Sequence, residues 1–573
     1  RARRLGDPRR RLRVALVVLA FVLSLFFGRL LQLQGVDASV YAARAEQERL
    51  VSQVVPAPRG AILDRNRVAL AATVDARNVT ADPTLVKNPA ATAADLAPVL
   101  GADPATLTRE LSRKDTRFVY LAKEVSPQTW DAVRKLDLVG IFDEPVSKRV
   151  YPNGSLAANV VGFLGADGKP LGGLEYALDQ RLRGTNGRET FEAALGRQIP
   201  GATNRLQPPV AGGDVVLTID RDIQWAAQQA ITAKVAEAGA ASGTVVVLDP
   251  KTGEVLAMAT APTFDPTQPG RAPAADRGNR VVSDVYEPGS TGKLVTAAAL
   301  VDAGKITPQT PITVPPQLPR AGTVFNDSEP HGELKLTFTG VLAKSSNIGT
   351  ILASERLSSQ QLYDYFRRFG LGQPTGLGFP GESPGLLPPP SQWSGTQRYT
   401  LAFGQGYSVN TLQSADTFAT IANAGVRVTP TLVKGYVDPG GRFQPAPAPA
   451  RTQVVSAQAA QTVAQMLETV TQPGGTASNV TIPGYRIAGK TGTANRVDAA
   501  CGCYRGYTSS FIGFAPADNP ALVVAVVLQD PQRGKYGSQL AGPVFRDVMS
   551  FALQSRKVPP TGAPPPALPL TAP

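Results

Sequence analysis

The chain has 573 residues, of which 43% are hydrophobic, and a mean hydropathy of −0.07, a balance typical of globular proteins. This length suggests about three or four folded units, and the formal net charge is +13. One histidine and two cysteines argue against a zinc site, a haem or iron–sulfur centre, and a disulfide-rich scaffold. Any Ser-His-Asp triad would have to use His331.

The N-terminal segment carries about half of the net charge, since residues 1–13 hold seven arginines and one aspartate. An apolar run, residues 14–33, follows and is interrupted only by Arg29. It is long enough to cross a bilayer if Arg29 extends to the far interface. Arginines before such a span predict a cytoplasmic N-terminus, and the weaker charge of the remaining chain does not favour nucleic acid. The alternative is a cleaved signal peptide, but the weak cleavage pattern at residues 43–45 lies far beyond the apolar run.

Beyond the apolar run, composition divides the chain. Residues 36–53 have a helical composition, residues 54–188 suggest a loop-rich α+β domain, and the Gly/Pro-rich residues 196–213 suggest a linker. Strands are predicted at 214–219, 485–488, 509–514 and 521–528, a helix at 221–238, a hairpin from 244–248 and 254–258, and a helix-rich middle from 290 to 470. Strands at both ends of a helical middle indicate an α+β domain whose sheet closes from distant segments.

The first chemical motif is Ser290-Thr291-Gly292-Lys293, the single S-x-x-K of the chain. A preceding Pro-Gly and a following apolar run put Ser290 near a helix N-terminus, where Lys293 shares its face. A serine hydroxyl needs a base, and a lysine whose pKa is lowered can be that base. A capping serine and a surface lysine are the alternative interpretation.

The second motif is Ser345-Ser346-Asn347, which opens another apolar helical stretch. Ser345 and Asn347 would face one cleft as a hydroxyl relay and an amide ligand. The triplet is weak alone, because residues 408–410 have the same S-x-N pattern and most such triplets are caps or turns.

The third motif, Lys490-Thr491-Gly492-Thr493, continues a predicted strand. A strand can pair with an extended peptide, Lys490 supplies a cation, and both threonines supply hydroxyls. A second K-T-G at residues 251–253 lies in the predicted hairpin turn and is interpreted as structural.

In this order the three motifs are the signature of penicillin-binding proteins and β-lactamases, with Ser346 in place of the usual aspartate. The chain resembles the class B penicillin-binding proteins, which are membrane-anchored peptidoglycan D,D-transpeptidases, and is most similar to the divisional FtsI type. The resemblance covers nearly the whole chain, and its Arg/Ala-rich composition is in keeping with an actinobacterial source. Further matching segments are 29–34, 59–66, 149–163, 173–184, 286–291, 404–407 and 541–545. Arg67 departs from a glycine usual in the family.

The resemblance implies an α+β architecture with a single transmembrane helix. The chain is expected to divide into a cytoplasmic basic arm (1–13), the anchor (14–33), an elongated loop-rich α+β pedestal of the dimerisation type (34–210), a transpeptidase domain (211–555), and a disordered Pro/Ala-rich tail (556–573). The transpeptidase domain would hold a central antiparallel sheet flanked by helices, plus an all-helical lobe.

The resemblance also implies roles for the motif residues. Ser290 would attack the bond between the two terminal D-alanines of a stem peptide, with Lys293 as general base. Ser345 and Asn347 would shuttle the proton and hold the substrate, and the backbone N–H groups of Ser290 and Thr493 would form the oxyanion hole. Lys490 and the Thr491-Gly492-Thr493 segment would bind the terminal carboxylate.

The expected partners are stem peptides as donor and amine acceptor, β-lactams as covalent inhibitors, a SEDS-type glycan polymerase and divisome proteins. No metal or organic cofactor is expected. The alternatives are an elongation-type class B transpeptidase, a D,D-carboxypeptidase, a serine β-lactamase, and a non-catalytic β-lactam sensor. The motifs leave septal or lateral use, the acceptor amine and the oligomeric state open.

Cys501 and Cys503 are too close in sequence for an unstrained disulfide, yet an exported site is oxidising. A bridge that rigidifies a loop near the cleft is a hypothesis that the sequence leaves open.

Overall fold

The computed structural model describes residues 7–194, 197–198, 204–498 and 501–573. They form two compact units, one of Arg1–Pro58 with Gly184–Ala211 and one of Arg59–Arg183 with Gly212–Pro573. Residues 1–6 of the predicted basic arm lie outside the described residues.

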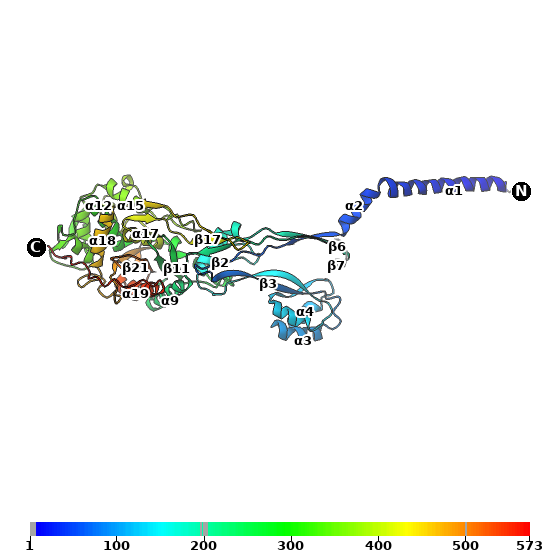
Figure 1. Ribbon diagram of the computed structural model, residues 1–573, viewed down its shortest axis with the longest axis horizontal. Helices are drawn as coiled ribbons and strands as arrows, with labels where there is room; N and C mark the ends of the chain where they lie inside the picture. Colours follow the sequence, from blue (N-terminus) through cyan, green and yellow to red (C-terminus); the bar gives the residue numbers. More distant parts are fainter. Residues whose placement is uncertain (1–6, 195–196, 199–203, 499–500) are drawn as a thin grey trace. The chain divides into compact units, whose positions relative to one another are not determined.

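The first unit begins with a long apolar helix, α1 (Pro8–Leu31), which continues as the π-helical turn η1 (Gln32–Val36) (Figure 1). The Asp7 carboxylate caps its first turn, and Pro8 suits a first helical position because its missing N–H has no partner there. Within the described residues it is the one helix long and apolar enough to cross a membrane, and an 18-residue stretch of it has a mean hydropathy of 2.5. The helix fits a single-pass membrane anchor, as the sequence predicted.

The rest of this unit is helix α2 (Ala38–Arg49) and a small antiparallel sheet of β1 (Leu50–Val55), β6 (Gly187–Ala194), β7 (Arg197–Gln198) and β8 (Asn204–Gln207). The helix predicted for residues 36–53 is wrong at its end, because the valine-rich segment β1 pairs with β6 instead. The linker predicted from residue 196 is wrong for β8, which pairs with the other edge of β6.

The second unit contains the loop-rich α+β region of the sequence prediction. A sheet in the order β18-β17-β9-β2-β3-β4, with β5 also on β3, joins strands from distant parts of the chain. Helices α3 (Pro89–Leu100), α4 (Pro104–Leu111) and α5 (Pro127–Arg134) share an apolar core with β3 and β4. The strands are β2 (Ile62–Leu63), β3 (Ala69–Ala81), β4 (Val119–Val125), β5 (Ile141–Val150), β9 (Asp214–Leu217), β17 (Val433–Val437) and β18 (Phe443–Pro445).

Three N-terminal segments singled out in the sequence meet at one buried carboxylate. Glu175, in helix α7 (Gly173–Ala177), is fully buried and accepts from Arg59 Nε at 2.6 Å and Arg149 Nε at 2.8 Å. Arg59 also pairs with Asp179, and Arg149 Nη1 donates to the Gly60 carbonyl at 2.8 Å. The segments 59–66, 149–163 and 173–184 are therefore tied together by one ion-pair cluster.

Arg67 occupies a position where glycine is the natural choice, because its φ is +65° in the turn after β2. Asp64 stabilises this turn by accepting the backbone N–H groups of Asn66 and Val68, both at 2.8 Å.

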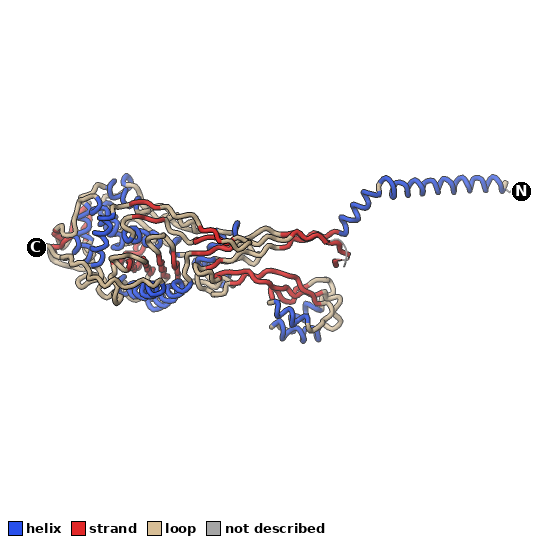
Figure 2. The backbone as a smooth tube through the Cα atoms, in the orientation of Figure 1, coloured by secondary structure: helices blue, strands red, loops and turns tan. Residues whose placement is uncertain are grey.

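The C-terminal part of this unit is built on a five-stranded antiparallel sheet in the order β11-β10-β22-β21-β20. Helices α9 (Arg221–Ala238) and α19 (Gly537–Ser555) lie side by side and share an apolar core with the sheet (Figure 1). Helix α17 (Thr411–Ala422) packs on β10, β21 and β22, and Figure 2 shows strands running between helical layers. The strands are β10 (Ser242–Leu248), β11 (Val255–Ala261), β20 (Ala488–Asp498), β21 (Cys503–Ala515) and β22 (Leu522–Gln529).

The sheet agrees with the predicted hairpin and late strands, except that β20 begins at Ala488. Residues 485–487, predicted as strand, precede it, and the Tyr485 hydroxyl donates to the Val558 carbonyl at 2.6 Å. A helical lobe of the same unit packs around the main apolar core. Its helices are α12 (Lys293–Asp302), α13 (Phe338–Ala343), α14 (Asn347–Ser354), α15 (Ser359–Arg368) and α18 (Ala457–Glu468). Two-stranded pairs interrupt these helices: β12 (Pro311–Val314) with β15 (Leu334–Thr337), β13 (Leu318–Arg320) with β14 (Thr323–Phe325), and β16 (Val426–Val428) with β19 (Arg451–Gln453).

The Pro/Ala-rich tail makes ordered contacts with the lobe. The Leu570 carbonyl accepts the backbone N–H of Thr337 at 3.1 Å, and Ala572 N–H donates to the Lys335 carbonyl at 3.1 Å. Leu568 packs against the main apolar core. The prediction of a disordered tail is wrong for these residues. The free edge of β15 offers backbone N–H and C=O groups, and the residues between the prolines of the tail can hydrogen-bond to them.

We expect Glu175→Ala to lower the free energy of unfolding by about 3–5 kcal/mol, because the guanidinium groups of Arg59 and Arg149 would stay buried without their carboxylate. Chemical denaturation of the full chain measures this change. Asp131→Ala, which removes the exposed ion pair with Arg134, is the control and should cost no more than about 1 kcal/mol. Equal losses in the two variants would contradict the central role of Glu175.

Candidate active site

Ser290 and Lys293 lie where the loop after Pro288 becomes a helix. Residues Gly289–Gly292 form a 3-10 turn, and Lys293 is the first residue of α12. The next seven residues are buried, so the helix draws the Lys293 side chain into the domain, where it is fully buried. Ser290 stays partly exposed and lines a cleft of about 540 Å³. Serine and lysine thus occupy the expected helix start.

The Lys293 amine is held by the second motif. Its Nζ donates to the Ser345 carbonyl at 2.5 Å and to Asn347 Oδ1 at 2.8 Å, and lies 3.3 Å from Ser345 Oγ. Ser345 is in the turn between α13 and α14 with a φ of +62°, and Asn347 is the first residue of α14. Among the hydrogen bonds of the described residues, those of Lys293 go to this motif and none goes to Ser290.

Lys490 approaches the same hydroxyl from the sheet. It lies in β20, is fully buried, and places its Nζ 2.9 Å from Ser345 Oγ. It also donates to the carbonyl and the hydroxyl of Thr491, each at 3.3 Å. Ser345 Oγ therefore lies between two lysine amines that are far apart in the sequence.

The rest of the third motif forms one wall of the cleft. Thr491 and Thr493 line it together with Ser290 and Ser345, and Thr493 Oγ1 accepts the backbone N–H of Gly537 at 3.3 Å. Gly492 carries no side chain because a Cβ there would lie 2.3 Å from Ser510 Oγ. This close approach lets β20 lie against β21 beside the turn that carries Ser290.

Two buried amines in contact with one hydroxyl cannot both keep the pKa of a lysine in water. Burial lowers the pKa of Lys293 to about 7, and the negative charge of Asp327 opposes this shift. Burial, and then the nearby charge of Lys293, hold the pKa of Lys490 well below its usual value. Lys293 therefore has a neutral, proton-accepting form near neutral pH.

Several cleft residues escaped the sequence analysis: Asp327 comes from the loop between β14 and β15, and Tyr507, Lys535 and Tyr536 come from β21 and the segment before α19. His331, the histidine that a triad would have needed, lies in the same loop as Asp327, with Nε2 3.1 Å from Asp327 Oδ2. Isolated polar residues in loops carry no spacing signal, so sequence patterns do not find them.

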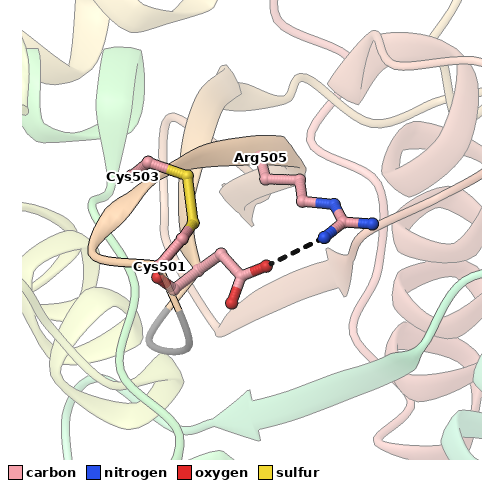
Figure 3. The surroundings of a disulfide bond; sticks show 4 residues. Cys501, Cys503 and Arg505 are labelled. Carbon is pink, nitrogen blue, oxygen red and sulfur yellow. Dashed lines mark hydrogen bonds and ion pairs between the residues drawn. A yellow bond between two sulfur atoms is a disulfide. The ribbon is translucent and has the colours of Figure 1, made fainter.

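Cys501 and Cys503 form a disulfide at the turn between β20 and β21, which answers the question that the sequence left open (Figure 3). Arg505 lies 3.7 Å from Asp498 at the base of the same turn. The next residue after the bridge, Tyr504, donates its hydroxyl to Glu287 at 3.0 Å, three residues before Ser290. Burial raises the pKa of Glu287.

A search of the described residues finds no group of three or more Cys, His, Asp or Glu side chains that could hold a metal ion. The chemistry of the cleft is that of a partly exposed serine beside a buried lysine of lowered pKa, with a second lysine and two threonines on an edge strand. Fold and cleft together define a serine–lysine acyl-transfer protein.

Comparison with known proteins gives the family. Residues 243–550 match the penicillin binding protein transpeptidase domain, and residues 54–217 match the penicillin-binding protein dimerisation domain. The chain is 40% identical to penicillin-binding protein PbpB of Mycobacterium tuberculosis, over 98% of this chain and 86% of that protein. It is 34% identical to the peptidoglycan D,D-transpeptidase FtsI of Escherichia coli, over 95% and 91%. The chain belongs to the class B penicillin-binding proteins, and an actinobacterial source fits the mycobacterial relative.

Solved structures agree with this assignment. Penicillin binding protein 3 of Mycobacterium tuberculosis in complex with aztreonam has a TM-score of 0.71 and 37% identity, over 91% of this chain and 100% of that one. Penicillin binding protein 2X of Streptococcus thermophilus shares the fold, with a TM-score of 0.77 at 23% identity over 89% and 80%.

If Lys293 is the base that the sequence predicts, we expect acylation by a fluorescent penicillin to slow about tenfold per pH unit below the pKa of Lys293, because only a neutral amine can accept a proton. Burial places that pKa at about 7, so the loss should begin there. The second-order rate constant is measured by gel fluorescence at a series of pH values. A constant rate between about pH 5 and 8 would contradict Lys293 as the base.

Proposed function

We propose that the chain is a serine D,D-transpeptidase that crosslinks peptidoglycan stem peptides through an acyl-enzyme on Ser290. The observation that carries the proposal is the buried Lys293 amine, held at Ser345 and Asn347 beside a partly exposed serine. His331, the single histidine, is bound to Asp327, which supports lysine as the base in its place.

In the first step Ser290 Oγ attacks the carbonyl carbon between the two terminal D-alanines. Lys293 Nζ takes the hydroxyl proton as the C–O bond forms. The proton then passes to the leaving nitrogen, with Ser345 Oγ as the relay because it contacts both Lys293 and Lys490. The C–N bond breaks, free D-alanine departs, and the donor stem remains as an ester on Ser290.

The groups around Ser290 supply the binding and charge stabilisation for this step. Lys490, Thr491 and Thr493 bind the terminal carboxylate, since the threonine hydroxyls line the cleft and the Lys490 amine lies behind them. The backbone N–H groups of Ser290 and Thr493 stabilise the oxyanion. Gly492 allows the strand to lie close enough to Ser290 for this arrangement.

In the second step an amine from a neighbouring stem attacks the ester carbonyl. The amine loses a proton to the same lysine, the new amide forms, and Ser290 regains its hydroxyl proton. β-Lactams acylate Ser290 because their strained amide occupies the place of the D-alanyl bond. The attack of the amine on the ester distinguishes a transpeptidase from a D,D-carboxypeptidase, in which water takes the place of the amine.

We expect Ser290→Ala to lose covalent labelling by fluorescent penicillin completely, because the Ser290 hydroxyl is the group that forms the ester in the proposed reaction. Gel fluorescence of the full chain in detergent measures the label. The matched control is Ser394→Ala, a surface serine whose loss should leave labelling unchanged. Label surviving in Ser290→Ala would overturn the site assignment.

The products of the same protein decide between the two acyl acceptors. Incubation with donor stem peptide and an amine acceptor should release D-alanine and yield crosslinked dimer, and Ser290→Ala should yield neither. D-Alanine release with trimmed peptide and no dimer would favour the D,D-carboxypeptidase.

The cellular setting belongs to the same proposal. The similarity to FtsI and PbpB supports septal wall synthesis with divisome proteins and a SEDS-type glycan polymerase as partners, and a lateral wall role is the alternative. The arginines of residues 1–13, which precede the apolar part of α1, support a cytoplasmic N-terminus and an extracytoplasmic catalytic domain.

This topology predicts that protease added outside intact spheroplasts degrades the catalytic domain and spares an epitope placed before residue 8. Immunoblots against the epitope and against the domain measure the two outcomes. Protection of the domain from the added protease would contradict the proposed orientation.

A further inference from the structure

Asp327 touches the second motif at more points than any other carboxylate in the described part of the cleft. It lies in the loop between β14 and β15, and its Oδ2 accepts the Ser346 hydroxyl at 2.6 Å. Its Oδ1 accepts the backbone N–H groups of Asn347 at 2.5 Å and Ile348 at 3.0 Å. The carboxylate thus binds both the middle residue of the motif and the first turn of α14.

The conformation of Ser345 explains why such a clamp matters. Its φ of +62° is a left-handed conformation that costs a non-glycine residue about 1–2 kcal/mol. The turn persists only if its surroundings hold it, and Asp327 holds the three residues that follow. Because the Ser345 carbonyl and Asn347 Oδ1 both accept from Lys293, a shift of this turn would also move the Lys293 amine.

The negative charge of Asp327 lies at the N-terminus of helix α14. A carboxylate at the N-terminus of a helix is stabilised by the unpaired N–H groups and partial positive charge there. The family triplet often carries an aspartate at its middle position, and this chain has Ser346 instead. Here a loop nineteen residues away brings a carboxylate to the Ser346 hydroxyl. His331 Nε2 lies 3.1 Å from Oδ2 of the same carboxylate.

We propose that Asp327 is a positioning residue for acylation, whose carboxylate fixes Ser345 and Asn347 around the Lys293 amine. The proposal depends on the transpeptidase function proposed above only in that both use acylation of Ser290. Asp327 touches neither Ser290 nor the substrate carbonyl in this scheme, and acts through Ser346 and the start of α14.

The electrostatics of Lys293 support the same geometry and supply a readout that a purely structural role would not move. The groups facing the Lys293 amine are Ser345, Asn347 and Lys490, and the nearby charge of Asp327 raises its pKa against the effect of burial. Removing that charge should lower the pKa of Lys293, so the acid limb of the acylation profile should move to lower pH.

The test is Asp327→Asn in the full chain, which keeps the side-chain size and removes the charge. We expect the second-order rate constant for acylation by fluorescent penicillin to fall about 10- to 100-fold on the pH plateau, because misplacing a catalytic group by about 1 Å costs on this order. The acid limb should shift to lower pH at the same time. An unchanged rate constant with an unchanged acid limb would overturn the proposal.

A matched control separates positioning from general loss of stability. Asp220 is a buried aspartate that, like Asp327, accepts two N–H groups at a helix start, at 3.1 and 3.3 Å, but it caps α9 and does not line the cleft. Asp220→Asn should leave acylation and its pH limb unchanged. An equal loss of acylation in Asp220→Asn would overturn the proposal, because it would show that any lost helix cap disables the protein.

A further variant keeps the proposal testable if Asp327→Asn does not fold. Ser346→Ala removes one of the three contacts of Asp327 with residues 346–348 and should slow acylation about 3- to 10-fold without a large change in melting temperature. A wild-type rate in Ser346→Ala would overturn the proposal. If wild-type chain is not labelled at Ser290 at all, the proposed function fails, and that outcome is distinct from a failure of Asp327 alone.

Discussion

The buried Lys293 amine is the constraint on which the rest of the site depends. An amine fully removed from water is costly when charged, and it is tolerated here because the Ser345 carbonyl and Asn347 Oδ1 accept from it at 2.5 and 2.8 Å. The same burial lowers its pKa to about 7, which makes a lysine useful as a base at neutral pH. One physical effect therefore explains both why the second motif must be close and why no histidine is needed.

The sheet and the lobe are arranged so that three distant segments reach this amine. Lys293 begins a buried helix, Ser345 lies in a left-handed turn between two helices, and Lys490 comes from the edge strand β20. Strand β20 can lie close to the turn that carries Ser290 because two residues there are glycines. A Cβ at Gly289 would lie 3.0 Å from Ala494, and one at Gly492 would lie 2.3 Å from Ser510 Oγ. Glycines at these two points let the turn that carries Ser290 lie against strand β20.

Much of the local structure could be predicted from the sequence. Helix α9 begins and ends at the predicted residues, and the hairpin of β10 and β11 has the predicted turn, because local composition and turn residues decide both. The errors lie where a distant partner overrides local preference. Residues 50–53 pair with β6 and leave the helix, β8 pairs where a linker was predicted, and residues near 570 hydrogen-bond to β15.

The sequence by itself determined the family and the reaction class of this protein, because the order and types of the motif residues are those of the penicillin-binding transpeptidases. Only the tertiary structure decided how that chemistry is supported. The ion pairs of Glu175 with Arg59 and Arg149, and the contacts of Asp327 with the second motif, join residues 19 to 116 positions apart. No periodicity or spacing marks such pairs, since they form when separate elements pack and bury charges that must then find partners.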